Sequence, residues 1–290
     1  MKNSSTPSLL PGDVVVRERF GSRRGLFGSM NPGRVLDVPA GGGEQSAALA
    51  ALGYRVISAD LFPRRDHRAE LGWVCADANG RFPFRDESFD YVLSREGIEH
   101  LENQMGFVRE CARVLRPGGT LVLTTPNVMH LAARVSTLLS GQRNLRRGLV
   151  NEVQTLRGGS GGRLYHGHAF MLDYFRARYM MRLAGLTRIE VFSDRRSPTS
   201  IAASPLIPLL WCAMKFSVAV SARNARRPGH RPPPRAVTDE IMRHVLSPAL
   251  LYGKRMILVA EKESECDVRR PATDLLSDSR LAAPEAYRAS

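Results

Sequence analysis

A glycine-rich segment between a short apolar run and a helix-forming stretch is the feature that most constrains the fold of this chain. Residues 34–38 are apolar enough for a buried strand, Pro39–Gly43 holds three consecutive glycines, and residues 44–52 are rich in Ala and Leu. A strand, a glycine-rich turn and a helix N-terminus let the charged groups of a ligand approach backbone N–H donors. Such a turn decides little when it stands alone, because tight turns that bind nothing are common.

Further apolar runs at a regular spacing indicate the fold class. They are expected strands at residues 55–60, 73–77, 89–94, 120–125, 187–192 and 255–260. Two stretches with helical periodicity, residues 107–115 and 174–183, lie among them. Strands that alternate with helices predict an α/β fold, a doubly wound Rossmann-like sheet of seven mostly parallel strands with an insertion before the last strand.

Acidic residues end the first three expected strands: Asp37, Asp60 and Asp77. A carboxylate at the second strand end can accept from both hydroxyls of a ribose, and one at the third can accept from an adenine amino group. Together with the glycine-rich turn, the three acids predict a ligand that contains adenosine.

Five motifs follow one another in a specific order. They are Leu36–Gly43, Phe82–Phe84, Ser88–Val92, Glu99–Leu101 and Leu115–Gly119. Their order resembles that of the class I S-adenosylmethionine-dependent methyltransferases, over residues 33–192 and the last strand. The resemblance implies an enzyme with S-adenosylmethionine as cofactor. The cofactor-binding residues that it implies are Asp37, Ala40, Gly41, Gly43, Asp60, Leu61, Asp77, Ala78 and Ser94.

Pro39 departs from this pattern, because the family usually has a glycine there, and proline lacks an N–H and fixes φ. Binding is expected to survive, since the donors nearest the ligand are expected after Ala40. Nicotinamide enzymes also combine such a turn with an acid at the next strand end. The motifs Phe89–Val92 and Arg116–Gly119 belong to the methyltransferase pattern and favour it over a dehydrogenase.

A group of acids and histidines follows the fourth strand. On a helical turn Glu96, Glu99 and His100 would fall at i, i+3 and i+4 and share one face. Two carboxylates and an imidazole suit Mg²⁺ or Mn²⁺, and such an ion would lower the pKa of an acceptor hydroxyl. His168 is expected to complete this metal set as a fourth ligand or to act as a general base.

The resulting candidates for catalysis are His100, His168 and Glu96. The arrangement is similar to that of the metal-dependent small-RNA 3′-terminal 2′-O-methyltransferases, and its first part to that of the ubiquinone-pathway O-methyltransferases. Two alternatives remain at this point. In the first, Glu99 and His100 have only a structural role in a turn. In the second, methyl transfer needs no metal and depends on positioning of the substrates and on a histidine that acts as the base.

The charge of the chain favours acidic partners, since 42 Lys and Arg stand against 28 Asp and Glu, a net charge of +14. Ile201–Val220 has one charge, Lys215, and residues 195–238 contain eight basic residues and no Asp or Glu. Pro205 and Pro208 speak against a membrane-spanning helix. The segment suits the surface of an anionic membrane, or else it is a lid helix followed by a solvated linker.

The expected organisation is an N-terminal extension (1–30), a methyltransferase core (31–194) with a substrate cap (128–170), an apolar and basic insertion (195–253), the last strand (254–262) and a flexible tail (263–290). The four cysteines form no C-x-x-C pair, and residues 1–12 lack a secretory apolar stretch. A cytoplasmic protein at the inner face of the membrane is expected, with no obligate protein partner.

The arginines of the cap suit a phosphate-bearing acceptor. They are Arg134, Arg143, Arg146, Arg147, Arg157 and Arg163. The leading prediction is methyl transfer to the hydroxyl of a small, glycan or lipid-linked acceptor, because the cap offers few aromatic residues for stacking RNA bases. The alternatives are an RNA ribose 2′-O-methyltransferase and a non-catalytic scaffold, which only Pro39 supports.

Overall fold

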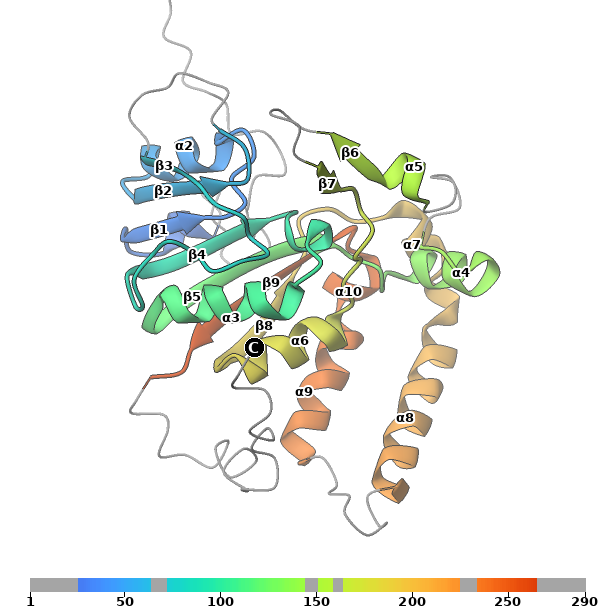
Figure 1. Ribbon diagram of the computed structural model, residues 1–290. Helices are drawn as coiled ribbons and strands as arrows, with labels where there is room; N and C mark the ends of the chain where they lie inside the picture. Colours follow the sequence, from blue (N-terminus) through green and yellow to red (C-terminus); the bar gives the residue numbers. More distant parts are fainter. Residues whose placement is uncertain (1–25, 64–71, 144–150, 159–163, 225–233, 265–290) are drawn as a thin grey trace, which may run out of the picture.

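Seven strands form one sheet in the order β3-β2-β1-β4-β5-β9-β8 in the computed structural model, which describes residues 26–63, 72–143, 151–158, 164–224 and 234–264 (Figure 1). The strands are β1 (Arg34–Asp37), β2 (Arg55–Asp60), β3 (Gly72–Cys75), β4 (Phe89–Arg95), β5 (Leu115–Pro126), β8 (Leu186–Phe192) and β9 (Arg255–Lys262). All are parallel to their neighbours except β9, which runs antiparallel to both β5 and β8. The predicted α/β sheet is confirmed.

The helices of the described residues are η1 (Phe27–Ser29), α2 (Glu44–Ala51), η2 (Ile98–His100), α3 (Gln104–Val114), α4 (Leu131–Ser140), α5 (Glu152–Thr155), α6 (Tyr174–Leu183), α7 (Pro198–Ala202), η5 (Ser204–Leu206), α8 (Ile207–Asn224), α9 (Arg235–Val245) and α10 (Pro248–Tyr252). Three of them, α2, α3 and α6, agree closely with the helical stretches expected from the sequence, and no such stretch was predicted for the other helices. A hairpin of β6 (Leu156–Gly158) and β7 (Leu164–His166) stands apart from the main sheet (Figure 1).

Successive residues of the central strands point to opposite faces of the sheet, and both faces are covered. Leu36 and Val92 belong to a buried cluster with side chains of α3 and α6. Val35 and Leu93, one position away, belong to a second cluster with η1 and α2. This double burial explains why the strands are continuous apolar runs rather than alternating ones.

The strand expected at residues 120–125 begins earlier than predicted and includes residues 116–119. They lie within β5 at a break in register, since Leu115 pairs with Phe89 and Thr120 with Tyr91. Gly118 has a φ of 74°, which favours glycine. Residues 116–119 therefore form an irregularity inside the strand, and α3 ends directly before it at Val114.

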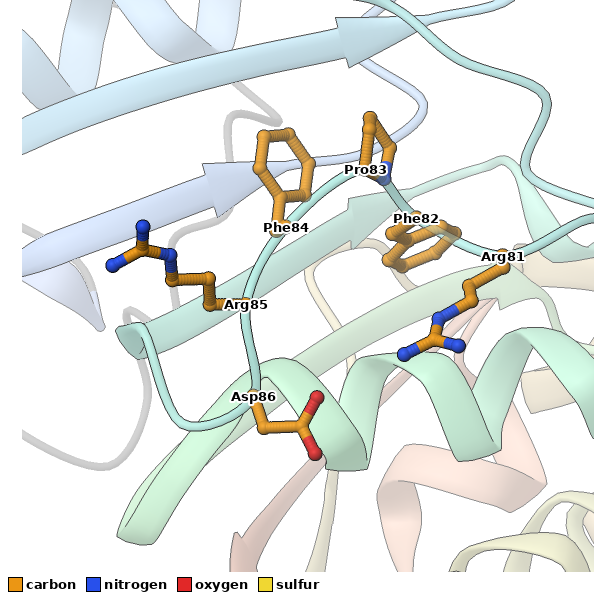
Figure 2. A pocket seen from close by; sticks show the side chains of 6 residues that line it. All are labelled: Arg81, Phe82, Pro83, Phe84, Arg85 and Asp86. Atoms are coloured by element: carbon orange, nitrogen blue, oxygen red, sulfur yellow. The ribbon is translucent and has the colours of Figure 1, made fainter.

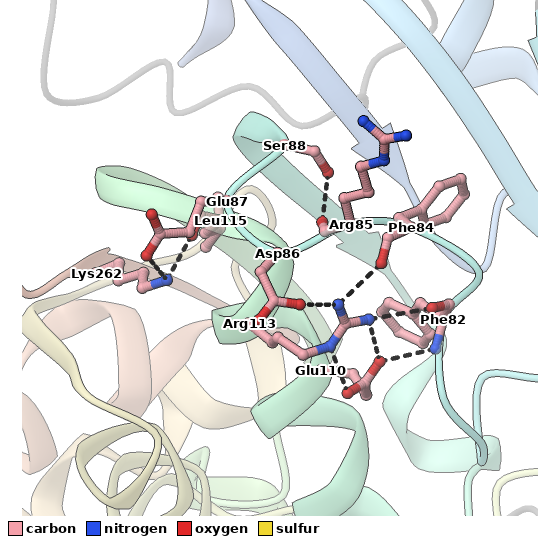
Figure 3. A network of polar contacts seen from close by, with 10 residues as sticks. All are labelled: Phe82, Phe84, Arg85, Asp86, Glu87, Ser88, Glu110, Arg113, Leu115 and Lys262. Atoms are coloured by element: carbon pink, nitrogen blue, oxygen red, sulfur yellow. Dashed lines mark hydrogen bonds and ion pairs between the residues drawn. The ribbon is translucent and has the colours of Figure 1, made fainter.

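Arg113 near the end of α3 fastens the segment that precedes β4 (Figure 3). Its guanidinium donates to the carbonyl oxygens of Phe82 (3.0 Å) and Phe84 (2.8 Å) and pairs with Asp86 (2.6 Å) and Glu110 (2.7 Å). Glu110 also accepts from the N–H of Phe82 (2.7 Å). The motif around Phe82 is therefore structural, since its polar backbone groups are bound by two side chains of α3.

The insertion before β9 is largely helical. Pro205 lies in η5 and Pro208 in the first turn of α8, where proline is tolerated, so neither interrupts the helix. By length and composition, Ser204–Asn224 could cross a membrane. No residue of α8 is buried, and it is the side with Met214 that packs against the core cluster.

Some predictions fall on parts of the chain outside the described residues. They concern most of the N-terminal extension, residues 144–150 and 159–163 of the cap with the arginines at 146, 147 and 163, residues 225–233 of the insertion and the tail from residue 265. Cys75, Cys111 and Cys212 are free thiols.

Candidate active site

The turn after β1 is closed by backbone hydrogen bonds. The N–H of Ala40 donates to a carbonyl oxygen of β2 (2.9 Å), and the N–H of Gly41 donates to Asp60 Oδ2 (2.8 Å). The other oxygen of Asp60 accepts from the N–H of Phe62 (3.0 Å). Gly41 and Gly43 have φ of 58° and 83°, which favour glycine. Asp60 thus joins the ends of β1 and β2.

Two of the donors that were expected to face a ligand are used within the protein. Besides Gly41, Gly43 donates its N–H to the carbonyl oxygen of Ala40 (2.9 Å). Pro39 packs against Gly97, because a Cβ atom on Gly97 would lie 2.3 Å from Pro39 Cδ. Gly97 has an ordinary φ of −116°, so it is the approach of the proline ring that requires glycine. The turn after β1 therefore touches the loop after β4.

Asp37 is buried beneath the turn. Its Oδ2 accepts from Ser46 Oγ (2.6 Å), which in turn accepts from Ser58 Oγ (2.7 Å). Burial raises the pKa of Asp37 to about 7, and the Ser46 hydrogen bond offsets this only in part. The side chain ties α2 to β1 and β2.

The remaining predicted cofactor residues follow the carboxyl ends of β2, β3 and β4. Asp77 is exposed, and its Oδ1 accepts from the N–H of Asn79 (2.9 Å), whereas Ala78 is buried and Leu61 half-buried. Ser94 is fully buried, and within the described residues its Oγ has no hydrogen-bond partner. The carboxyl edge of a doubly wound sheet is where ligands bind.

Three side chains meet beyond β4: Glu99 and His100 on η2, and His168 in the turn after β7. One ligand atom of each, a carboxylate oxygen or an imidazole nitrogen, lies within 4.8 Å of the other two. The two imidazole rings meet edge to face, with centroids 5.0 Å apart. We refer to Glu99, His100 and His168 as the trio.

Hydrogen bonds orient two members of the trio. His100 Nδ1 lies 2.6 Å from the carbonyl oxygen of His166, which can only accept, so Nδ1 carries a proton and Nε2 presents its lone pair. Glu99 Oε2 accepts from Thr125 Oγ1 (3.0 Å). Glu99 Oε1 is buried and has no hydrogen-bond partner among the residues the structure describes. Burial, with the nearby charge of Glu96, raises the pKa of Glu99 to about 7.

The loop that carries His168 is fastened to η2 at both ends. Gln104 Nε2 donates to the carbonyl oxygens of Ile98 (2.9 Å) and Phe170 (2.6 Å), and the N–H of Phe170 donates to the carbonyl oxygen of Glu99 (3.1 Å). At the other end, His166 Nε2 lies 2.5 Å from Glu102 Oε1. The segment after β7 therefore closes directly over the turn that holds Glu99.

Known proteins match the first part of the chain. Residues 36–123 match a family model described as a methyltransferase domain. This chain contains a class I S-adenosylmethionine-dependent methyltransferase domain. Over 103 residues it is 37% identical to the ubiquinone biosynthesis O-methyltransferase of Parvibaculum lavamentivorans, with 32% of this chain and 40% of that protein covered.

This chain is also similar to a second curated relative and to a solved structure. The ubiquinone biosynthesis O-methyltransferase of Agrobacterium fabrum is 33% identical over 140 residues, with 45% of this chain and 55% of that protein covered. The match thus spans about half the length of these relatives. A solved S-adenosylmethionine-dependent methyltransferase from Archaeoglobus fulgidus is 14% identical with a TM-score of 0.45, over 80% of this chain and 87% of that one.

Glu96 does not join the trio of this methyltransferase domain. The predicted helical face is wrong, because η2 begins only at Ile98 and Glu96 has a φ of 49°, outside the right-handed helical region. Its Oε1 lies 3.1 Å from Arg255 Nε at the start of β9. Glu96 therefore joins β4 to β9, and its charge acts on Glu99 only from outside the group.

The sequence analysis did not predict that cationic side chains would surround His130, the N-cap of α4. Burial and then the charges of Arg143, Lys254 and Arg134 lower the pKa of His130 to about 4. Arg134 donates through Nε to the carbonyl oxygen of Met129 (2.6 Å). Only the arginine content of the cap hinted at this group, because Lys254 comes from a segment far along the chain.

An open pocket is lined by Arg81–Asp86, the segment that leads to β4 (Figure 2). None of the trio and none of the predicted cofactor residues line it. Asp86 is paired with Arg113, and Phe82 is buried against Phe107. We assign no chemistry to this pocket and place the candidate active site at the carboxyl ends of the strands.

Proposed function

We propose that this protein transfers a methyl group from S-adenosylmethionine to the hydroxyl oxygen of a small, glycan or lipid-linked acceptor, with a divalent metal ion held by Glu99, His100 and His168. The trio carries the proposal, because it lies next to the strand ends where the methyltransferase domain is expected to bind its cofactor. Two imidazoles and a carboxylate leave open positions on an ion for an acceptor oxygen.

The residues of the trio fit a divalent cation. The buried Glu99 Oε1 lacks a partner among the described residues, and a cation would neutralise this carboxylate where burial opposes its charge. The His100 tautomer leaves Nε2 free of a proton, as a ligand must be. A bound Mg²⁺ or Mn²⁺ would supply Lewis acidity and lower the pKa of the acceptor hydroxyl.

The residues around the trio have positioning roles in this proposal. Thr125 holds the Glu99 carboxylate, and the carbonyl oxygen of His166 holds the His100 ring. Gln104 keeps the segment after β7 over the site. Methyl transfer in line depends mainly on such positioning of donor and acceptor. Asp60 is the residue proposed to bind the ribose of the cofactor.

The neighbourhood of His130 supports an acceptor that bears a phosphate. Arg134, Arg143 and Lys254 oppose the protonation of His130, and the charge of Arg143 also reaches Glu99. A glycan or lipid linked through phosphate would supply the anion. RNA would do so too, but the aromatic rings near the site face one another rather than open space: Tyr165 packs on Phe62, and Phe170 on His166.

Calorimetric titration with S-adenosylhomocysteine tests cofactor binding. The wild type is expected to bind, and Asp60→Ala is expected to lower affinity at least roughly 10-fold, since it removes an acceptor for the ribose hydroxyls. No binding by the wild type would overturn the proposal in favour of the non-catalytic scaffold.

Methyl transfer from labelled S-adenosylmethionine into a cell extract tests the acceptor class. Label is expected in the solvent-extractable or the glycan fraction with the wild type and in neither fraction with Asp60→Ala. Label confined to RNA would instead support the ribose 2′-O-methyltransferase.

A further inference from the structure

Helix α8 presents an apolar face to solvent that no described part of the chain covers. Leu209, Phe216 and Val220 lie on one side of the helix and are 69%, 72% and 38% exposed. The opposite side, which includes Met214, is partly buried against the body of the protein. A large exposed apolar face of this kind marks a site of association. We call the outward side, Leu209, Phe216 and Val220, the α8 face.

Two exposed side chains elsewhere on α8, outside the α8 face, also have the character of a lipid interface. Lys215 Nζ lies 5.5 Å from the centroid of the Trp211 ring, and Trp211 is 48% exposed. Trp and Lys combine an apolar body with a polar or charged tip, which suits the boundary between headgroups and acyl chains. The helix α4, which packs on α7, carries two further apolar side chains, Leu138 and Leu139, that are 85% and 72% exposed.

The positive charge of the sequence around α8 favours an anionic partner. Residues 195–238 contain eight basic residues and no Asp or Glu. Among them, Arg223 lies in the last turn of α8 and Arg235 begins α9. Basic residues next to an interfacial helix attract anionic headgroups, at about 1 kcal/mol each near the surface.

The fold excludes a single crossing of the membrane by α8, although its length and composition would permit one. Ahead of α8, Ser200 Oγ in α7 contacts His130 Nδ1 (2.8 Å). After α8, Glu240 in α9 pairs with Arg178 (3.2 Å) and Arg182 (3.0 Å) of α6. Both ends of α8 are therefore bound to the same folded body, on one side of any bilayer (Figure 1).

From these observations we infer that the α8 face docks in the plane of an anionic lipid bilayer, as a monotopic anchor that does not cross it. The apolar side chains enter the acyl boundary, and the basic residues contact the headgroups. The inference stands independently of the methyltransferase activity.

Vesicle co-sedimentation of the full chain tests this inference. The wild type is expected to pellet with vesicles that contain phosphatidylglycerol and to remain in solution with pure phosphatidylcholine. Leu209→Ser/Phe216→Ser is expected to lower the partition coefficient roughly 100-fold, since two apolar side chains no longer leave water. Leu52→Ser, at an exposed apolar residue after α2, is the matched control and should pellet like the wild type.

Fluorescence gives a second readout at the same helix. In Trp211→Phe/Phe216→Trp, which moves the indole onto the α8 face, anionic vesicles are expected to shift the tryptophan emission to shorter wavelength. Equal pelleting of the wild type and Leu209→Ser/Phe216→Ser would overturn the inference. So would a dimer in lipid-free buffer that Leu209→Ser/Phe216→Ser dissociates, because the α8 face would then bind a second copy of the chain.

Discussion

The two buried carboxyl groups of the candidate site differ in their partners. Asp37 accepts from Ser46, which is fixed by Ser58, so its surroundings are complete within the protein. Glu99 accepts from Thr125 through one oxygen, while the other has no partner within the described residues. Burial raises the pKa of both groups to about 7. The sequence predicts Asp37 as a cofactor residue at a strand end and Glu99 as a metal ligand on a helical turn. The structure shows that Glu99 is the one of the two with a carboxylate oxygen that has no partner among the described residues.

Asp37 is expected to make stability depend on pH. Because its pKa is raised from 3.8 to about 7, the folded protein holds this proton more tightly than the unfolded chain. The free energy of unfolding therefore falls as pH rises between about 4 and 7, by up to ~4 kcal/mol from this group. In urea unfolding measured over this pH range, Asp37→Asn should reduce the fall in the free energy of unfolding. The part of the fall that comes from Glu99, whose pKa is also raised, should remain. Asp77→Asn, which changes an exposed acid, is the control and should keep the pH dependence of the wild type. If Asp37→Asn also kept the full fall in the free energy of unfolding, the account would be contradicted.

Gly97→Ala is expected to damage the cofactor turn. The new Cβ would overlap the Pro39 ring, at 2.3 Å from its Cδ, and the turn after β1 would have to move. We expect a loss of stability of about 1–3 kcal/mol together with weaker binding of S-adenosylhomocysteine, measured by thermal unfolding and calorimetry. Gly80→Ala is the matched control, because its nearest neighbour would lie at 3.7 Å. Equal behaviour of the two variants would refute the contact with Pro39.

At the scale of the elements, α3 and the segment before β4 depend on one arginine. Arg113→Ala removes hydrogen bonds to Phe82 and Phe84 and leaves Glu110 without its partner (Figure 3). We expect the free energy of unfolding to fall by about 2–4 kcal/mol, measured with urea. Arg109→Ala, at an exposed position of the same helix, should change it by less than about 0.5 kcal/mol. A loss for Arg113→Ala as small as for Arg109→Ala would show that the network contributes little.

The strands and helices could be predicted because each is specified locally, by an apolar run or a helical period. The conformation of the loop after β4 could not be predicted from the sequence. Helical spacing placed Glu96 with Glu99 and His100, but the chain takes a φ of 49° at Glu96, and Arg255 from the last strand pairs with it. Neither the backbone turn nor a partner so distant in the sequence leaves a local signal. His168 is the opposite case, because its place beside His100 follows from the predicted loop over the site.

At the scale of the whole molecule, α8 lies at the margin of the core, where Met214 packs against the core cluster. No residue of α8 is buried, so Leu209→Ser/Phe216→Ser is expected to leave the free energy of unfolding within about 0.5 kcal/mol of the wild type. Urea unfolding without lipid measures this directly. A larger loss would mean that Leu209 and Phe216 pack on the body of the protein and are not available to a lipid surface.

The affinity for Mn²⁺, measured by electron paramagnetic resonance on two isosteric variants, tests the central claim most directly. Glu99→Gln should weaken binding at least roughly 10-fold, because it removes a charged ligand of the trio. Glu96→Gln should stay within about 3-fold of the wild type, because Glu96 pairs with Arg255 outside the trio. Binding that Glu96→Gln abolishes and Glu99→Gln leaves intact, or a wild type that binds no Mn²⁺, would contradict the account.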